Sequence, residues 1–118
     1  MVMETRKFDL EERTQDFSKE IILLCYSIKN TSVSGPLIRQ LVRSGTSIGA
    51  NYCEATETGS KKDFRHKLLI AKKEAKETIY WLKLLKLAEG TDNGKIDLLI
   101  SEAKELLLIF AASIRKVS

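Results

Sequence analysis

The sequence feature that constrains the fold most is an apolar stripe that continues without a break between residues 61 and 89. Its positions follow one another at alternating spacings of four and three residues. They are Phe64, Leu68, Ala71, Ala75, Thr78, Leu82 and Leu85. Such spacing places side chains on one face of an α-helix. The segment is therefore predicted to form a long helix that buries this face against other helices.

Three further segments show similar spacing, and short turns rich in Gly, Asn, Ser or Thr separate them. We expect helices over residues 9–30, 36–58, 61–89 and 95–116, within one domain over residues 1–118. Four helices of this length joined by short turns favour an all-α fold, an antiparallel up-down-up-down four-helix bundle. The single proline and the few aromatic residues suit that class.

Capping residues predict where the helices begin and end. A side-chain oxygen just before a helix accepts hydrogen bonds from its first N–H groups, and a left-handed glycine commonly ends a helix. The expected caps are Asp9 before the first helix, Ser34 or Gly35 before the second, Ser60 before the third and Gly90 after the third.

The second predicted helix has small and polar residues on the face that should pack. These are Ser44, Gly45, Ser47, Gly49 and Asn51. An interior glycine lowers helix stability by about 1 kcal/mol relative to alanine, so another interaction must compensate. We expect the close approach of a neighbouring helix, together with internal hydrogen bonds.

Arg43, Ser47, Asn51 and Glu54 recur at spacings of four, four and three residues, so they share one face of the second helix. One interpretation is a structural hydrogen-bonded network in which Arg43 and Glu54 satisfy each other's charge. The other is a catalytic or ligand-binding site, although the sequence offers no second carboxylate at a defined spacing from Glu54.

Positive charge is concentrated in the third predicted helix. The formal net charge of the chain is +4, and residues 61–89 alone contain nine Lys or Arg against four Asp or Glu. Six of these cations fall within about 100° of arc, opposite the apolar stripe. They are Lys62, Arg65, Lys72, Lys73, Lys76 and Lys83. This pattern is compatible with nucleic-acid binding, with another acidic partner, or with an ordinary solvated helix face.

The sequence lacks the motifs of common enzyme and cofactor sites. It has no phosphate-binding loop, no H-E-x-x-H, no C-x-x-C and no base-reading aromatic motif. We interpret His66 as a surface residue, and Cys25 and Cys53 as small buried hydrophobes. We therefore expect no enzyme activity, no catalytic residue, no metal site and no cofactor. Any nucleic-acid binding should depend on charge more than on base sequence.

Residues 106–112 are apolar all round the fourth predicted helix. A helix segment of this kind must be buried on more than one side. Deep burial within one chain is one interpretation, and a subunit interface in a homo-oligomer is the other. The candidate interface residues are Leu107, Leu108, Ile109, Ala111 and Ala112.

The second helix and the start of the third contain the pattern R-x-x-x-S-I-x-x-N-x-x-E followed by S-x-x-x-F. Its positions are Arg43, Ser47, Ile48, Asn51, Glu54, Ser60 and Phe64. The pattern resembles the signature of the 23S rRNA intervening-sequence proteins, also called four-helix bundle proteins, over about residues 36–88. Ala55 stands where that family usually has glycine.

This resemblance implies an antiparallel four-helix bundle that assembles into a ring, typically a pentamer. Some family members are encoded within insertions in large-subunit ribosomal RNA genes, and most have no established activity. A more distant likeness, to the accessory protein of diversity-generating retroelements, implies binding to nucleic acid and to a reverse transcriptase.

The sequence thus favours a non-enzymatic homo-oligomer that binds RNA or DNA weakly through the basic face of its third helix. The alternative is a protein–protein scaffold, or an accessory subunit of a nucleic-acid enzyme, that does not itself bind nucleic acid. No apolar run approaches the roughly 20 residues that cross a bilayer, and the first residues lack an apolar signal segment. We therefore expect no membrane partner and a cytoplasmic location.

Overall fold

The computed structural model describes residues 9–90 and 94–117, and within these ranges it contains α-helices and no strand. The helices are α2 (Leu10–Ser27), α3 (Ser34–Thr56), α4 (Lys61–Glu89) and α5 (Gly94–Lys116). The predicted all-α four-helix fold is confirmed. The bounds expected for the third helix are those observed for α4, whereas the other ends differ by up to three residues.

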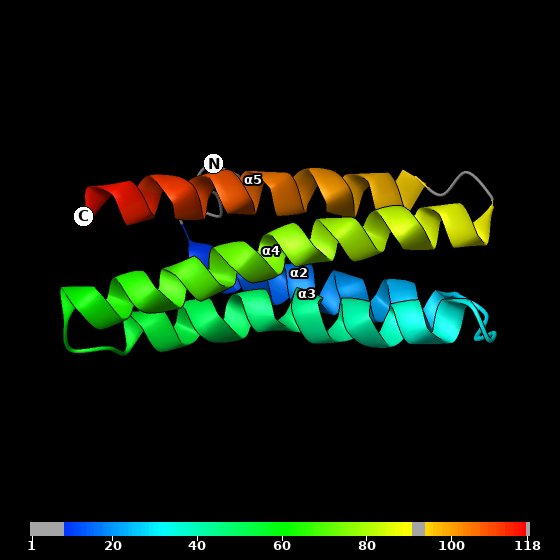
Figure 1. The fold of residues 1–118 in the computed structure, drawn as a ribbon, viewed down its shortest axis with the longest axis horizontal. Coiled ribbons are helices and arrows are strands. Elements are labelled where there is room, and N and C mark those ends of the chain that lie inside the picture. The colour runs from blue at the N-terminus through cyan, green and yellow to red at the C-terminus, as the bar shows by residue number, and fades with distance from the viewer. Residues whose placement is uncertain (1–8, 91–93, 118) are drawn as a thin grey trace.

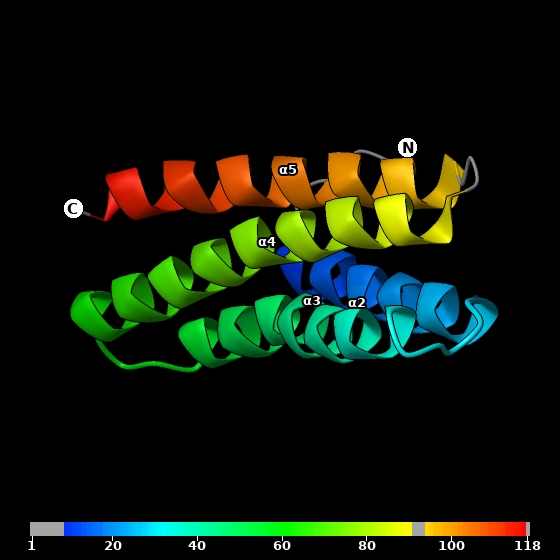
Figure 2. The same ribbon diagram turned by 45° about the vertical axis from the view of Figure 1, so that its right-hand side comes forward.

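Consecutive helices run in opposite directions along the length of the molecule (Figure 1). Each helix packs against its neighbours in the chain, and α2 and α5 close the bundle with the least extensive contact of the four pairs. Figure 2 shows α4 between α5 on one side and the α2–α3 pair on the other. The position of α4 leaves its outward side open along most of its length.

Side chains from all four helices form the core. Fully or almost fully buried examples are Phe17 and Ile21 of α2, Leu41 and Ile48 of α3, Leu82 of α4, and Leu106 and Phe110 of α5. The predicted stripe of α4 faces this core, and all of its positions are buried except Phe64, which is half-buried. Periodicity alone therefore located the buried face of the longest helix.

Three of the expected helix caps are confirmed. The Asp9 carboxylate accepts a hydrogen bond from the N–H of Glu12 at 3.1 Å, and Ser60 Oγ accepts one from the N–H of Asp63 at 3.1 Å. Gly90 ends α4 with a φ of 70°, a left-handed conformation that costs glycine little.

The predicted cap of the second helix and the predicted end of the first are wrong. The residue at the N-cap of α3 is Val33, which has no capping side chain, and Ser34 lies inside the first turn. Ser34 Oγ donates to the carbonyl of Lys29 at 2.7 Å and accepts from the N–H of Thr31 at 2.8 Å. These side-chain bonds give the loop an alternative to helix, so α2 ends at Ser27 and Ile28 is extended.

The small residues of α3 allow both neighbouring helices to come close. A Cβ placed on Gly45 would lie 3.0 Å from Ile21 Cγ1, and one on Gly49 would lie 3.2 Å from Thr14 Oγ1, both on α2. Toward α4, the buried Thr78 Oγ1 donates to the buried Ser44 Oγ at 2.9 Å. The expected close approach and internal hydrogen bonding are both present.

The contact of Gly45 with α2 can be tested by substitution. Gly45→Val should lower the free energy of unfolding by about 1–3 kcal/mol, because the added atoms overlap Ile21. Gly59→Val is the control, since a Cβ at Gly59 would meet nothing within 4 Å. Urea unfolding followed by circular dichroism measures both variants. Equal stability of the two would contradict the close packing of α3 on α2.

Candidate nucleic-acid interface

One side of α4 is exposed along its whole length. We call its residues, which follow each other at spacings of three and four, the α4 ridge. They are Lys62, His66, Leu69, Lys73, Lys76, Tyr80, Lys83 and Leu87, and all eight are exposed. The ridge therefore combines four lysines with exposed apolar and aromatic side chains.

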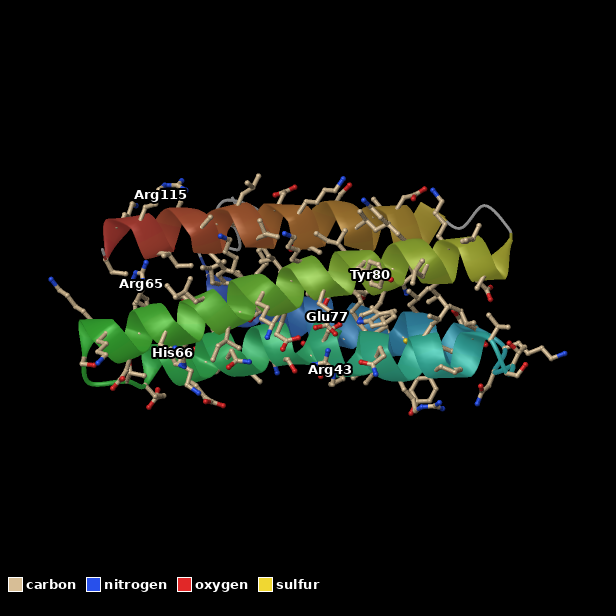
Figure 3. The ribbon with its side chains drawn as sticks, in the orientation of Figure 1. Arg43, Arg65, His66, Glu77, Tyr80 and Arg115 are labelled. Atoms are coloured by element: carbon tan, nitrogen blue, oxygen red, sulfur yellow. The ribbon has the colours of Figure 1, made fainter. Side chains whose placement is uncertain are left out.

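Four of the six predicted cations lie on the α4 ridge, and the other two lie beside it. Arg65 and Lys72 are half-buried. The ion pair between Lys86 and Asp97 of α5, at 2.8 Å, marks the side of α4 that faces α5. At 100° per residue, Arg65 and Lys72 point between that side and the ridge. Figure 3 shows Arg65 directed from α4 toward α5.

None of the six predicted cations makes an ion pair or a side-chain hydrogen bond with any residue in the described ranges. Two acidic side chains of α4, Glu74 and Glu77, lie instead on its flank toward α3. There, Arg43 of α3 pairs with Glu74 at 3.3 Å and with Glu77. No ion pair in the described ranges therefore neutralises a ridge lysine, although the charge of Lys73 contributes to the lowered pKa of Glu77.

Glu77 is the centre of a polar network on the flank of α4 that faces α3. Figure 3 shows Glu77 and Arg43 pointing toward each other across the seam between the two helices. Trp81 Nε1 donates to Glu77 Oε2 at 2.9 Å. The hydrogen bond from Trp81, together with the hydrogen bond and the charge of Arg43, lowers the pKa of Glu77. The ionised carboxylate thus connects α3 to the aromatic side chain of Trp81.

The fold and the sequence pattern agree with comparisons to known proteins. The family model described as 23S rRNA-intervening sequence protein matches residues 6–112. The chain belongs to this family. A crystal structure of a protein of unknown function from the S23 ribosomal protein family of Bacteroides thetaiotaomicron is similar, with a TM-score of 0.80 and 35% identity over 88% of this chain and 96% of that one. No curated protein matches the sequence.

In this member of the 23S rRNA-intervening sequence protein family, the charged residues of the signature contact α4. Glu54 pairs with Lys67 at 2.6 Å, whereas Arg43 pairs with Glu74 and Glu77. The expectation that Arg43 and Glu54 neutralise each other is wrong, because eleven residues of helix separate them by about 16 Å.

The two neutral members of the predicted network bond to their own helix. Ser47 Oγ donates to the carbonyl of Arg43 at 2.6 Å, and Asn51 Nδ2 donates to the carbonyl of Ser47 at 2.9 Å. The four residues therefore share one face of α3, as predicted, but they do not form one continuous side-chain network. Their structural role stays a prediction.

The predicted interface residues of α5 differ in exposure. Leu108 is 66% exposed, whereas Leu107, Ile109, Ala111 and Ala112 are partly buried within the single chain. Figure 1 shows that the C-terminal turns of α5 extend past the start of the described part of α2. The all-round apolar segment is thus only partly covered by α4 and by the rest of the described chain.

Sequence reasoning missed a cluster of charges that joins α2 to α5. Arg13 pairs with Glu102 at 2.6 Å and with Glu105 at 2.8 Å, and Lys95 pairs with Glu20 at 3.2 Å. The hydrogen bond to Glu102 is the main cause of a raised pKa for Arg13. Nothing in the sequence identifies these pairs, because they depend on how two helices distant in the chain are aligned.

The other candidate groups are His66 and the two cysteines. His66 is exposed, as expected, but Cys53 is exposed and Cys25 is half-buried, so the prediction of two buried cysteines is wrong. Burial raises the pKa of the Cys25 thiol to about 11, so the thiol is protonated at neutral pH. In the described ranges, His, Cys, Asp and Glu side chains form no group of three or more that could hold a metal ion. No helix in those ranges is both long enough and apolar enough to cross a bilayer.

The lowered pKa of Glu77 predicts a pH-dependent contribution to stability. The contribution is fully present above the ordinary glutamate pKa of about 4.3 and is lost as the pH falls through the lower folded-state pKa. Glu77→Gln should therefore be less stable than the wild type at neutral pH, and the difference should disappear in strong acid. Thermal unfolding of both proteins, followed by circular dichroism from neutral to strongly acidic pH, measures the difference in stability.

Glu89→Gln is the control for this experiment, because Glu89 forms no ion pair in the described ranges. It should show no loss of stability at neutral pH. A stability difference between the wild type and Glu77→Gln that stays the same from neutral to acidic pH would contradict the assigned role of the Glu77 carboxylate.

Proposed function

We propose that this protein is a non-enzymatic, cytoplasmic homo-oligomer that binds RNA or DNA through the α4 ridge and the adjacent Arg65 and Lys72. The observation that carries the proposal is the separation of charge on α4. The four ridge lysines, Arg65 and Lys72 make no ion pair in the described chain, while Glu74 and Glu77 pair with Arg43 on the flank of α4 toward α3. A row of cations about 30 Å long matches the extended charge of a phosphate backbone.

Oligomerisation strengthens this proposal through avidity. One ridge supplies a small number of phosphate contacts, which bind weakly at physiological salt. A ring of several copies would present several ridges to one strand, and linked weak contacts raise the overall affinity by orders of magnitude. The exposed Leu108 and the partly exposed side chains around it are the apolar surface that a second copy would cover.

A protein–protein scaffold is the second candidate, and one observation favours it. Leu87 and Leu69 of the α4 ridge are 78% and 38% exposed, and such side chains serve protein contacts as well as nucleic-acid contacts. In that case a pull-down with the purified protein would recover a protein partner, such as a nucleic-acid enzyme, but no RNA or DNA after nuclease treatment.

Removing three ridge lysines tests nucleic-acid binding directly. The variant Lys73→Gln, Lys76→Gln and Lys83→Gln should bind labelled RNA much more weakly at low salt. Its log–log salt dependence should also be shallower by about 2, because three phosphate contacts are lost. The matched control replaces Lys19, Lys29 and Lys104 with Gln, which removes equal charge from exposed positions on other parts of the bundle.

Fluorescence anisotropy with single-stranded and structured RNA at several salt concentrations provides the readout. The control variant should bind almost as the wild type does. Absence of binding at low salt, binding that does not depend on salt, or equal losses in the two triple variants would overturn the proposal.

The subunit interface is tested by placing a charge on α5. Leu108→Glu should shift the protein to smaller species in light scattering, because a carboxylate is costly to bury between subunits. Leu23→Glu on α2 is the control, since Leu23 is 52% exposed and is not part of the proposed interface. A wild-type protein that is monomeric at all concentrations would contradict the proposed ring.

A further inference from the structure

Tyr80 is the aromatic residue of the α4 ridge, and its ring is held in place although it is exposed. It is 56% exposed, and its centroid lies 5.0 Å from that of Trp81 in an edge-on arrangement with an interplanar angle of 73°. Its hydroxyl makes no hydrogen bond with any described residue. Figure 3 shows Tyr80 on α4, one turn beyond Glu77.

A chain of contacts fixes the support behind this ring. Trp81 is half-buried, and its Nε1 donates to Glu77, which is paired with Arg43 of α3. The Trp81 ring that packs edge-on with Tyr80 is therefore itself held by contacts to α3 and α4. An aromatic side chain that is ordered before binding loses little conformational entropy when it contacts a partner.

Cations lie on both sides of the Tyr80 ring along the helix. Lys76 precedes it by four residues and Lys83 follows it by three, so each lies about one turn away, at about 6 Å and 4.5 Å along the axis. Both lysines are exposed and make no ion pair in the described chain. A base stacked on Tyr80 would thus have its two flanking phosphates within reach of a lysine on each side.

We infer that Tyr80 stacks on an unpaired base, so that the α4 ridge takes single-stranded nucleic acid in preference to duplex. This inference rests on the proposed function and names its substrate class. In a duplex the bases stack on one another and their faces are closed to a side chain, whereas a single strand offers them. RNA and DNA single strands share this chemistry, because every base has a π-face.

Substitutions of Tyr80 separate stacking from charge. Tyr80→Leu should weaken binding of a labelled strand of about 12 uridines or thymidines by roughly tenfold, since stacking contributes about 1–3 kcal/mol per base. Tyr80→Phe keeps the ring and should bind almost as the wild type does. The salt dependence should not change, because no phosphate contact is removed. A blunt-ended duplex, which has no unpaired loop, should bind more weakly than the strand at an equal phosphate concentration and should not respond to Tyr80→Leu.

Tyr26→Leu is the matched control, because Tyr26 is 84% exposed but lies on α2, away from the ridge. The single tryptophan of the chain, Trp81, provides a second readout, since its emission should change when a strand binds beside it. Separate arms with RNA and DNA strands show which backbone the ridge prefers, and binding of either single strand over duplex supports the inference.

The outcomes also separate this inference from the proposed function. If the triple lysine variant loses binding but Tyr80→Leu does not, or if the duplex binds as tightly as the strand, the ridge binds nucleic acid and the stacking role of Tyr80 is wrong. If Tyr80→Phe binds the strand as weakly as Tyr80→Leu does, the stacking role of Tyr80 is also wrong. If no nucleic acid binds at low salt, the inference and the proposed function both fall.

Discussion

The structure depends on the close approach of α3 to its two neighbours. Gly45 and Gly49 leave room for Ile21 and Thr14 of α2, and a buried hydroxyl pair joins Ser44 to α4. Helices of a bundle can pack this closely only where the side chains between them are small and the buried polar groups are hydrogen-bonded. In the described chain every buried side-chain polar atom has a partner. The position of α4, and thus of its outward side, follows from this packing.

Charge on α4 is divided between its two flanks and its outer side. Arg43 pairs with Glu74 and Glu77 on the flank of α4 toward α3, and neither carboxylate forms an ion pair with a ridge lysine. The charge of Lys73 nevertheless contributes to the lowered pKa of Glu77. The same arginine, through Glu77 and Trp81, supports the ring of Tyr80. One residue of the family signature therefore links the α3–α4 seam to the surface that we assign to binding.

Much of the fold was predictable because the determining interactions are local. The spacing of apolar residues defined the buried face of α4, and Asp9, Ser60 and Gly90 marked helix ends through bonds to residues three or four positions away. The start of α3 was not predictable in this way. There, Ser34 bonds to the preceding loop instead of capping the helix, and the two geometries use the same residue types.

The sequence by itself determined four amphipathic helices, the basic side of the longest one and the small face of α3, since these properties depend only on helical periodicity. Only the tertiary structure decided which charges meet. Arg13 reaches Glu102, and Arg43 reaches Glu77 and not Glu54. Such pairs depend on the axial alignment of different helices, which the packing of the whole core sets. The same packing decides that Lys76, Tyr80 and Lys83 remain uncovered together.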